Sequence, residues 1–163
     1  MTGGKVHSVH YANSSQFEIR KMNPKITCVI PCFNEEEAIP LFYKEALAVL
    51  EPMKISYELI FVDDGSYDKT LTVIRNLQEK DSKVHFVSFS RNFGKEAALY
   101  AGLSKARGEY VAVMDADLQD PPSLLPDMMA AIESQGYDCA ATRRETRRNE
   151  PVVRSFFARL FYK

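Results

Sequence analysis

The chain has 163 residues, which is enough for one domain with a hydrophobic core. Its hydrophobic content of 45% and charged content of 26% are typical of a globular domain and exclude a disordered chain. The net charge of −1 provides no overall positive field, so nucleic acid is not expected as a partner.

The sequence contains no signal for secretion, for a membrane span or for a zinc site. No run approaches the about 20 apolar residues of a transmembrane helix, and the N-terminus lacks the apolar stretch of a signal peptide. Cys28 and Cys32 are not followed by a second pair of metal ligands, and the third cysteine is Cys139. We therefore expect three reduced thiols in a cytoplasmic protein.

Composition divides the chain into three parts. Residues 1–23 are polar and without periodicity, which predicts a disordered leader. Residues 24–142 carry the pattern of a folded domain. Residues 143–163 contain seven Arg or Lys and only two Glu, which indicates a basic segment with a separate role.

The folded part is predicted to alternate strands with helices. In chain order we expect a strand at 25–30, a helix at 35–50, a strand at 57–62, a helix from Asp68, a strand at 83–89, a helix at 92–107, a strand at 109–114, a helix at 120–136, a short strand at 138–142 and a final helix at 151–163. Asn34, Asp68 and Asp120 are the expected N-caps, and Gly108 and Gly136 the expected helix ends. This order predicts an α/β fold with a mainly parallel sheet.

Polar residues follow the first four predicted strands. In parallel sheets ligands bind beyond the carboxyl ends of the strands, so these residues are expected to share one site. No Gly-x-Gly-x-x-Gly follows the first strand, which argues against a nicotinamide or flavin cofactor. The absence of Gly-Lys-Ser/Thr argues against a P-loop.

The segment Asp115-Ala116-Asp117 is the most informative of these. Two carboxylates at this spacing repel each other unless a cation or hydrogen bonds compensate their charge. A hard divalent ion that bridges them to a diphosphate would do so, with Gln119 as a neutral oxygen ligand. The simpler interpretation is that Asp115 ends a strand and Asp117 caps a turn.

Three other strand ends offer both structural and functional interpretations. Asp63-Asp64-Gly65-Ser66 can be an ordinary turn, or its carboxylates can accept a nucleobase ring N–H. Asn34 can cap a helix whose amino end faces a nucleotide. Lys95 opens a helix, where a cation is unfavourable, and this suggests a nearby anion such as a diphosphate.

Together these motifs resemble family 2 glycosyltransferases with the GT-A fold, a Rossmann-like three-layer α/β fold. The resemblance extends from about residue 26 to the end of the chain. It is carried by four segments in order: 29–36 (VIPCFNEE), 61–66 (FVDDGS), 90–95 (SRNFGK) and 114–122 (MDADLQDPP). The last two resemble most the subgroup that transfers one sugar to a polyprenyl phosphate, such as dolichyl-phosphate mannosyltransferases and bacterial undecaprenyl-phosphate glycosyltransferases. Relatives of this subgroup continue into transmembrane helices, so we expect the chain to be C-terminally truncated.

The resemblance implies a role for each matching residue. The nucleoside pocket would be lined by Pro31, Asn34, Glu35 and Asp63. Ser66 and Lys95 would lie near the nucleotide phosphates, and Asp115 near the ribose or the metal. Asp117, with Gln119 and Asp115, would hold Mg²⁺ or Mn²⁺. The acceptor phosphate would be met by Arg143, Arg147 and Arg154, which makes Asp117 and Arg143 the expected catalytic residues.

The implied reaction moves one sugar from a nucleotide-sugar, for which we favour a UDP-sugar, to a polyprenyl phosphate with inversion. Val152, Phe156 and Leu160 share one helical face beside basic residues, a pattern typical of a helix at a membrane interface. We therefore expect a peripheral protein on the inner face of the membrane. The alternative is that this helix packs on the sheet.

Three other functions remain open at this point. A family 2 enzyme with a saccharide acceptor would need a carboxylate base beyond this chain. A nucleotide-sugar-binding module that has lost catalysis would retain the same donor residues. A nucleotidyltransferase would normally carry a Gly-rich loop after the first strand, where this chain has residues 31–35 (PCFNE).

Overall fold

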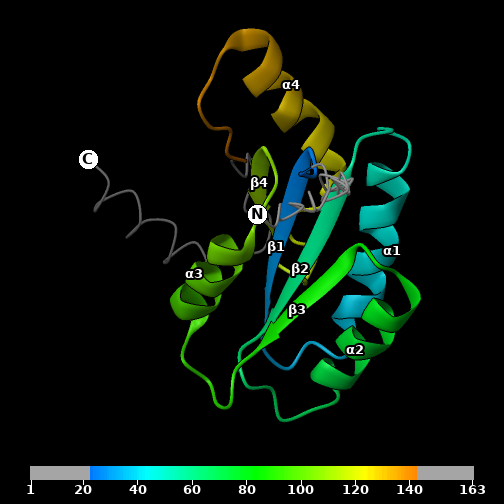
Figure 1. The fold of residues 1–163 in the computed structure, drawn as a ribbon, viewed down its shortest axis with the longest axis vertical. Helices are drawn as coiled ribbons and strands as arrows, with labels where there is room; N and C mark the ends of the chain where they lie inside the picture. The colour runs from blue at the N-terminus through cyan, green and yellow to red at the C-terminus, as the bar shows by residue number, and fades with distance from the viewer. Residues whose placement is uncertain (1–22, 143–163) are drawn as a thin grey trace, which may run out of the picture.

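The computed structural model describes residues 23–142, in which strands and helices alternate (Figure 1). The elements are β1 (Ile26–Cys32), α1 (Ala38–Leu50), β2 (Tyr57–Asp63), α2 (Thr70–Lys80), β3 (Val84–Ser88), α3 (Lys95–Lys105), β4 (Tyr110–Val113), the 3₁₀ turn η1 (Pro122–Leu124) and α4 (Leu125–Gln135). The first four predicted strands and the four helices between and after them are confirmed.

The strands form a parallel sheet in the order β3-β2-β1-β4. β1 pairs with β2 along its whole length, from Ile26 beside Tyr57 to Cys32 beside Asp63. All seven residues of β2 are buried, as expected for an inner strand covered on both faces. The prediction of a parallel α/β sheet is therefore confirmed.

Helices cover both faces of the sheet and make three layers. Phe42 of α1, Ile74 of α2 and Met129 of α4 share one apolar cluster with Phe61 of β2. On the other face α3 packs Ala98 against β2, and Figure 1 shows α3 on the side opposite α1 and α2. A Cβ at Gly102 of α3 would overlap a methyl group of Val29. The close approach of α3 to the sheet therefore requires glycine at this position.

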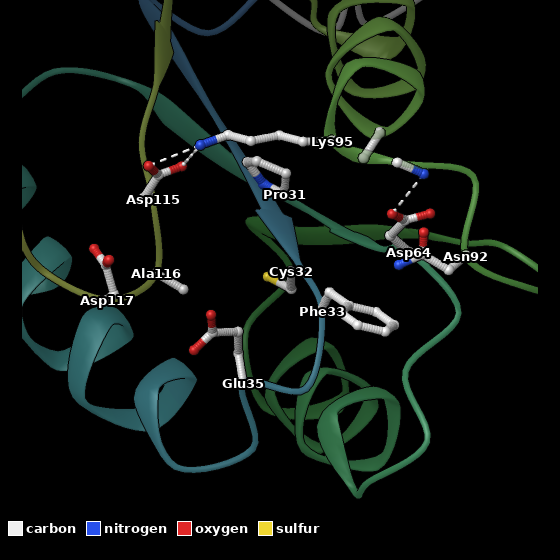
Figure 2. Close-up of a pocket in the computed structure, with 12 residues that line it drawn as sticks. Pro31, Cys32, Phe33, Glu35, Asp64, Asn92, Lys95, Asp115, Ala116 and Asp117 are labelled. Carbon is white, nitrogen blue, oxygen red and sulfur yellow. Dashed lines mark hydrogen bonds and ion pairs between the residues drawn. The ribbon is translucent and has the colours of Figure 1, made fainter.

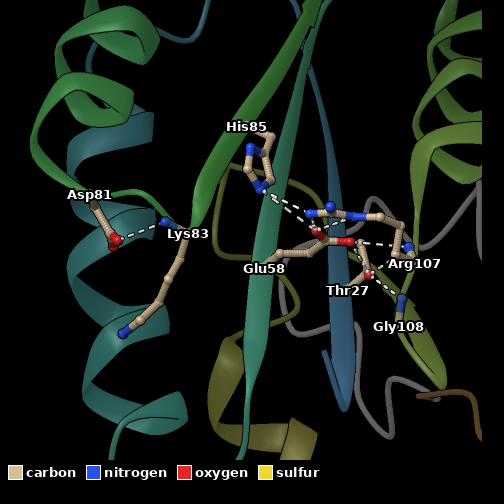
Figure 3. A network of polar contacts seen from close by, with 7 residues as sticks. All are labelled: Thr27, Glu58, Asp81, Lys83, His85, Arg107 and Gly108. Carbon is tan, nitrogen blue, oxygen red and sulfur yellow. Dashed lines mark hydrogen bonds and ion pairs between the residues drawn. The ribbon is translucent and has the colours of Figure 1, made fainter. Parts of the chain in front are cut away.

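A buried carboxylate fastens the amino ends of the central strands to the connection between α3 and β4 (Figure 3). Glu58 of β2 accepts hydrogen bonds from Thr27 Oγ1 at 2.7 Å and from Arg107 N at 3.0 Å, and it forms an ion pair with the Arg107 guanidinium. Burial alone would raise the pKa of Glu58, but the hydrogen bonds from Arg107 and Thr27 outweigh it and lower this pKa. The network ties the carboxyl end of α3 to β1 and β2.

The three cysteines are free and lie in two different environments. Cys28 and Cys32 are buried on β1, whereas Cys139 is exposed beyond α4. Burial raises the pKa of the Cys28 thiol to about 12 and raises that of Cys32 as well. The prediction of unpaired thiols, with Cys28 inside a strand, is confirmed.

The predicted strand at 138–142 is wrong. These residues have no regular secondary structure and are mostly exposed. Ala, Asp and Cys have little β-branched surface to bury, so strand pairing gains little there. Instead, Thr142 Oγ1 lies 3.4 Å from Asp120 Oδ1.

Several helix ends also differ from the prediction. Asn34, Asp68 and Asp120 are not N-caps, since the capping positions of α1, α2 and η1 are Glu37, Lys69 and Pro121. α3 ends at Lys105 rather than at Gly108. Only Gly136 ends its helix as predicted, in the left-handed conformation with φ 71°.

The remaining predictions concern residues outside the described range. They are the leader at 1–23, of which only residue 23 is described, the basic segment 143–163 and the helix at 151–163. Within 23–142, no helix is both long enough and apolar enough to cross a membrane.

Candidate functional site

The loops after all four strands meet at the carboxyl edge of the sheet and enclose a cavity of about 450 Å³ (Figure 2). It lies where ligands bind in open parallel sheets. Twelve residues line it: Pro31, Cys32, Phe33, Glu35, Asp64, Asn92, Gly94, Lys95, Ala98, Asp115, Ala116 and Asp117. The structure therefore brings together five of the residues singled out in the sequence, namely Pro31, Glu35, Lys95, Asp115 and Asp117.

Three other singled-out residues hold the loops together rather than line the cavity. Asn34, with φ 57°, donates its backbone N–H to Ser66 Oγ at 3.0 Å and accepts from Tyr67 N at 2.9 Å. Asp63 is 2% exposed and accepts from Ser66 N and Ser88 Oγ. These contacts join the loop after β1 to the loop after β2 and the end of β3.

Asp64 lines the cavity, whereas the resemblance assigned its neighbour Asp63 to the nucleoside pocket. Its carboxylate accepts the backbone N–H groups of Phe93 at 2.7 Å and of Gly94 at 2.9 Å. Adjacent residues of a strand point to opposite faces, but in a strand that is buried along its whole length this does not indicate which face lines the cavity. Asp64 thus fixes the loop that leads into α3.

Lys95 forms an ion pair with Asp115 across the cavity (Figure 2). Its Nζ lies 2.6 Å from Oδ1 and 2.8 Å from Oδ2. Lys95 is the first residue of α3, where the helix dipole disfavours a cation. The anion beside this lysine in the structure is therefore a side chain of the chain itself.

Glu35 and Asp117 face the same space and add negative charge. Burial raises the pKa of Glu35, and the charges of Asp117, Asp68 and Asp115 raise it further. Asp117 Oδ1 accepts the backbone N–H of Gln119 at 3.0 Å, and Gln119 does not line the cavity. Carboxylate oxygens are the ligands that Mg²⁺ and Mn²⁺ prefer, although no three acidic, His or Cys side chains of residues 23–142 group closely enough to hold an ion alone.

Phe33 forms an apolar wall of the cavity that the sequence analysis missed. Its ring is 39% exposed and lies edge-on to Tyr67, with ring centroids 5.9 Å apart. A large exposed aromatic directly after a strand end was the available signal.

A second cavity, of about 160 Å³, shares Lys95 and Asp115 with the first. Its walls include the apolar side chains of Met114, Leu124, Leu125 and Met128, and it also touches Thr142. The Lys95–Asp115 pair therefore stands between the two cavities. Arg143, Arg147 and Arg154 lie outside the described residues.

Residues 27–159 match the sequence profile of glycosyl transferase family 2. The chain belongs to this family. The family 2 chain is 42% identical over 139 residues to the bactoprenol glucosyl transferase of Shigella phage SfV, covering 85% of the chain and 45% of that protein. It thus spans less than half the length of this curated relative.

Solved structures place the family 2 chain in the GT-A fold. It is similar to the mannosyltransferase PcManGT from Pyrobaculum calidifontis in complex with GDP-Man and Mn²⁺, with 28% identity and a TM-score of 0.52 over 60% of the chain and 28% of that protein. It also resembles S. aureus TarS, with 20% identity and a TM-score of 0.60 over 77% of the chain and 40% of TarS. The fold expected from the four motifs is therefore confirmed.

Proposed function

We propose that the chain is the donor-binding part of a glycosyltransferase that moves one sugar from a nucleotide-sugar to a polyprenyl phosphate. The observation that carries this proposal is the convergence of Glu35, Lys95, Asp115 and Asp117 on one cavity of a family 2 chain. The name of the phage relative, bactoprenol glucosyl transferase, supports the lipid acceptor and a glucosyl donor.

The nucleoside would bind between the loops after β1 and β2. Phe33 offers a flat apolar ring, and Asp64 lies at the same wall of the cavity. Asn34, Asp63 and Ser66 would act indirectly, since they tie these two loops together. We favour a uridine nucleotide, on the subgroup resemblance.

The diphosphate would lie beside Lys95, at the amino end of α3. A helix amino end and an ammonium group both stabilise the negative charge that develops on a leaving diphosphate. Asp115 and Asp117 would hold Mg²⁺ or Mn²⁺, with Gln119 close to Asp117. When bound, the ion would act as a Lewis acid on the phosphate oxygens. PcManGT, solved with GDP-Man and Mn²⁺, supports the use of a divalent ion together with a nucleotide-sugar.

The acceptor would approach from the smaller, apolar cavity. Thr142 borders this cavity, and Arg143 is the next residue of the chain. Arginines pair readily with phosphate, so Arg143, with Arg147 and Arg154, would position the lipid phosphate for attack. This nucleophile is already ionised near neutral pH and needs no general base, and a single displacement would invert the anomeric centre. Segment 143–163 would lie at the inner surface of the membrane, so that this part of the protein would be peripheral to it, and the full-length form would be anchored in the membrane.

Calorimetric titration tests the donor site. We expect one of UDP, GDP and CDP to bind much more tightly with Mn²⁺ than without it, and Asp117→Ala to weaken the Mn²⁺-dependent binding at least about tenfold, because two carboxylates and the diphosphate share the ion. Glu79→Ala, an exposed acid of α2 away from the cavity, is the matched control.

A transfer assay distinguishes the alternatives. Sugar transfer from the preferred donor to a polyprenyl phosphate in detergent would support the proposal. Transfer to a saccharide alone would indicate a different acceptor class, and donor binding without transfer would indicate a binding module. A folded chain that binds no nucleotide contradicts the proposal.

A further inference from the structure

The ammonium group of Lys95 contacts the carboxylate of Asp115, one of the two acids that would hold the metal ion in the proposed site. It lies within 2.8 Å of both carboxylate oxygens, so that neither oxygen is left without a cation beside it. Among the ion pairs formed within residues 23–142, this pair alone involves an acid of the main cavity. The cavity thus contains a counter-ion for Asp115 from the chain itself.

Lys95 is also free to leave this position. Its side chain is 55% exposed and that of Asp115 is 43% exposed, so the pair is screened by water and weak. A lysine ammonium sits on a flexible four-carbon stem and pairs as a point charge. The diphosphate of a bound nucleotide would present oxygens to the same group, in the cavity that Lys95 lines.

We propose that Lys95 acts as an exchangeable counter-ion, which holds Asp115 until the donor diphosphate draws it away and opens Asp115 to the metal ion. This inference rests on the proposed donor site and specifies how that site fills. Lys95 and the ion would compete for Asp115 in the free chain, whereas a bound diphosphate would give the Lys95 ammonium group a partner of its own. Metal and nucleotide therefore bind cooperatively, and each increases the affinity of the chain for the other.

The number of acids in the site supports this coupling between metal binding and nucleotide binding. Asp115 and Asp117 provide two carboxylates, and no third acidic, His or Cys ligand within residues 23–142 completes a metal-binding group. Magnesium-like ions with one or two carboxylate ligands normally gain further ligands from substrate phosphates. The small number of protein ligands and the competition from Lys95 both predict that the ion binds weakly when no nucleotide is present.

The decisive measurement is Mn²⁺ binding to the nucleotide-free chain by electron paramagnetic resonance. Lys95→Met removes the charge but keeps the length, and should raise Mn²⁺ affinity about three- to fivefold. Lys95→Arg keeps the charge and should bind Mn²⁺ like the parent chain. Lys105→Met, at the other end of the same helix, is the matched control and should also leave Mn²⁺ affinity unchanged.

A substitution of Asp115 tests whether releasing Lys95 from this ion pair makes it available to the diphosphate. Asp115→Asn releases Lys95, so in the presence of EDTA this variant should bind UDP more tightly than the parent chain does, by a similar factor.

With Mn²⁺ present, Lys95→Met should bind UDP more weakly than the parent, because the diphosphate loses its ammonium partner. Thermal melting of every variant shows whether it is folded, and Lys95→Gln replaces Lys95→Met if the latter does not fold.

The outcomes separate this inference from the proposed function. Unchanged or lower Mn²⁺ affinity in a folded Lys95→Met chain overturns the counter-ion role, even if the parent binds UDP with Mn²⁺. Increased Mn²⁺ affinity in a chain that binds no nucleotide would uphold the competition for Asp115 and overturn the donor site.

Discussion

Glu35 shows how a residue of the site affects stability. Burial and the charges of Asp117, Asp68 and Asp115 raise its pKa above the ordinary 4.5. The folded chain therefore binds this proton more tightly than the unfolded chain, and stability falls as pH rises from about 4.5 through the raised pKa. Above that range, ionised Glu35 opposes folding.

We predict that Glu35→Gln stabilises the chain at pH 7, with a rise in Tm of roughly 1–3 °C, since the site is partly exposed and screened. The difference from the parent should vanish below about pH 4.5, where Glu35 is protonated in both states. Melting curves at pH 7 and pH 4 measure this. An equal or lower Tm of the variant at pH 7 contradicts the prediction.

The sequence identified residues of the site by type and by position after strands. Lys95 and Asp115 could be found in this way, because a lysine at a helix start and an Asp after an apolar strand each need a partner. The assignment of Asp63 rather than Asp64 to the cavity could not be decided, because it depends on which face the last residue of β2 turns to. The pairing of Lys95 with Asp115 also depends on tertiary structure, since 20 residues separate them.

At the scale of elements, the loops of the site depend on one tight turn. Gly65 has φ 69°, and a Cβ there would overlap the backbone of Arg91 and Asn92. The turn after β2 therefore packs directly on the loop before α3. Gly136 has a similar φ of 71°, but a Cβ there would meet nothing within 4 Å.

This contrast gives a matched pair of substitutions. Gly136→Ala should cost about 1 kcal/mol of unfolding free energy, from backbone conformation alone. Gly65→Ala should cost about 2–4 kcal/mol, because collision with the backbone of Arg91 and Asn92 adds to the same strain, and it should also weaken nucleotide binding. Urea unfolding of both variants measures the difference, and equal losses would contradict the close packing of the two loops.

The fold was largely predictable at this scale, for a physical reason. Short, continuous apolar runs alternate with segments whose apolar residues recur at helical spacing. The runs predict strands buried on both faces, and the spaced residues predict helices buried on one face. Asn34 illustrates what was not predictable. It has the chemistry of an N-cap but is held by Ser66 and Tyr67 from a distant loop, so that α1 begins at Ala38. The strand expected at 138–142 does not form, because its side chains would bury little apolar surface in a sheet.

At the scale of the whole molecule, β4 lies at an edge of the described sheet. It pairs with β1 alone among the strands of residues 23–142. Val111 and Val113 are 44% and 50% exposed on it. An apolar edge strand is a template for pairing with another chain.

We therefore predict weak self-association of the isolated chain through β4. Replacing both valines by threonine keeps β-branched side chains but removes apolar surface, and should shift the association constant about tenfold towards monomer. Sedimentation equilibrium over a concentration series measures it. Val73→Thr on α2 is a comparison substitution remote from this edge, and equal association of parent and double variant would refute the role of β4.

The unequal access of the three thiols gives the chain a natural labelling scheme. Cys28 and Cys32 are buried and hold their protons at neutral pH, whereas Cys139 is exposed. A maleimide fluorophore should therefore attach at Cys139 alone, three residues before Thr142 at the border of the smaller cavity. The unsubstituted protein can thus carry one reporter dye close to the region where donor and acceptor would meet.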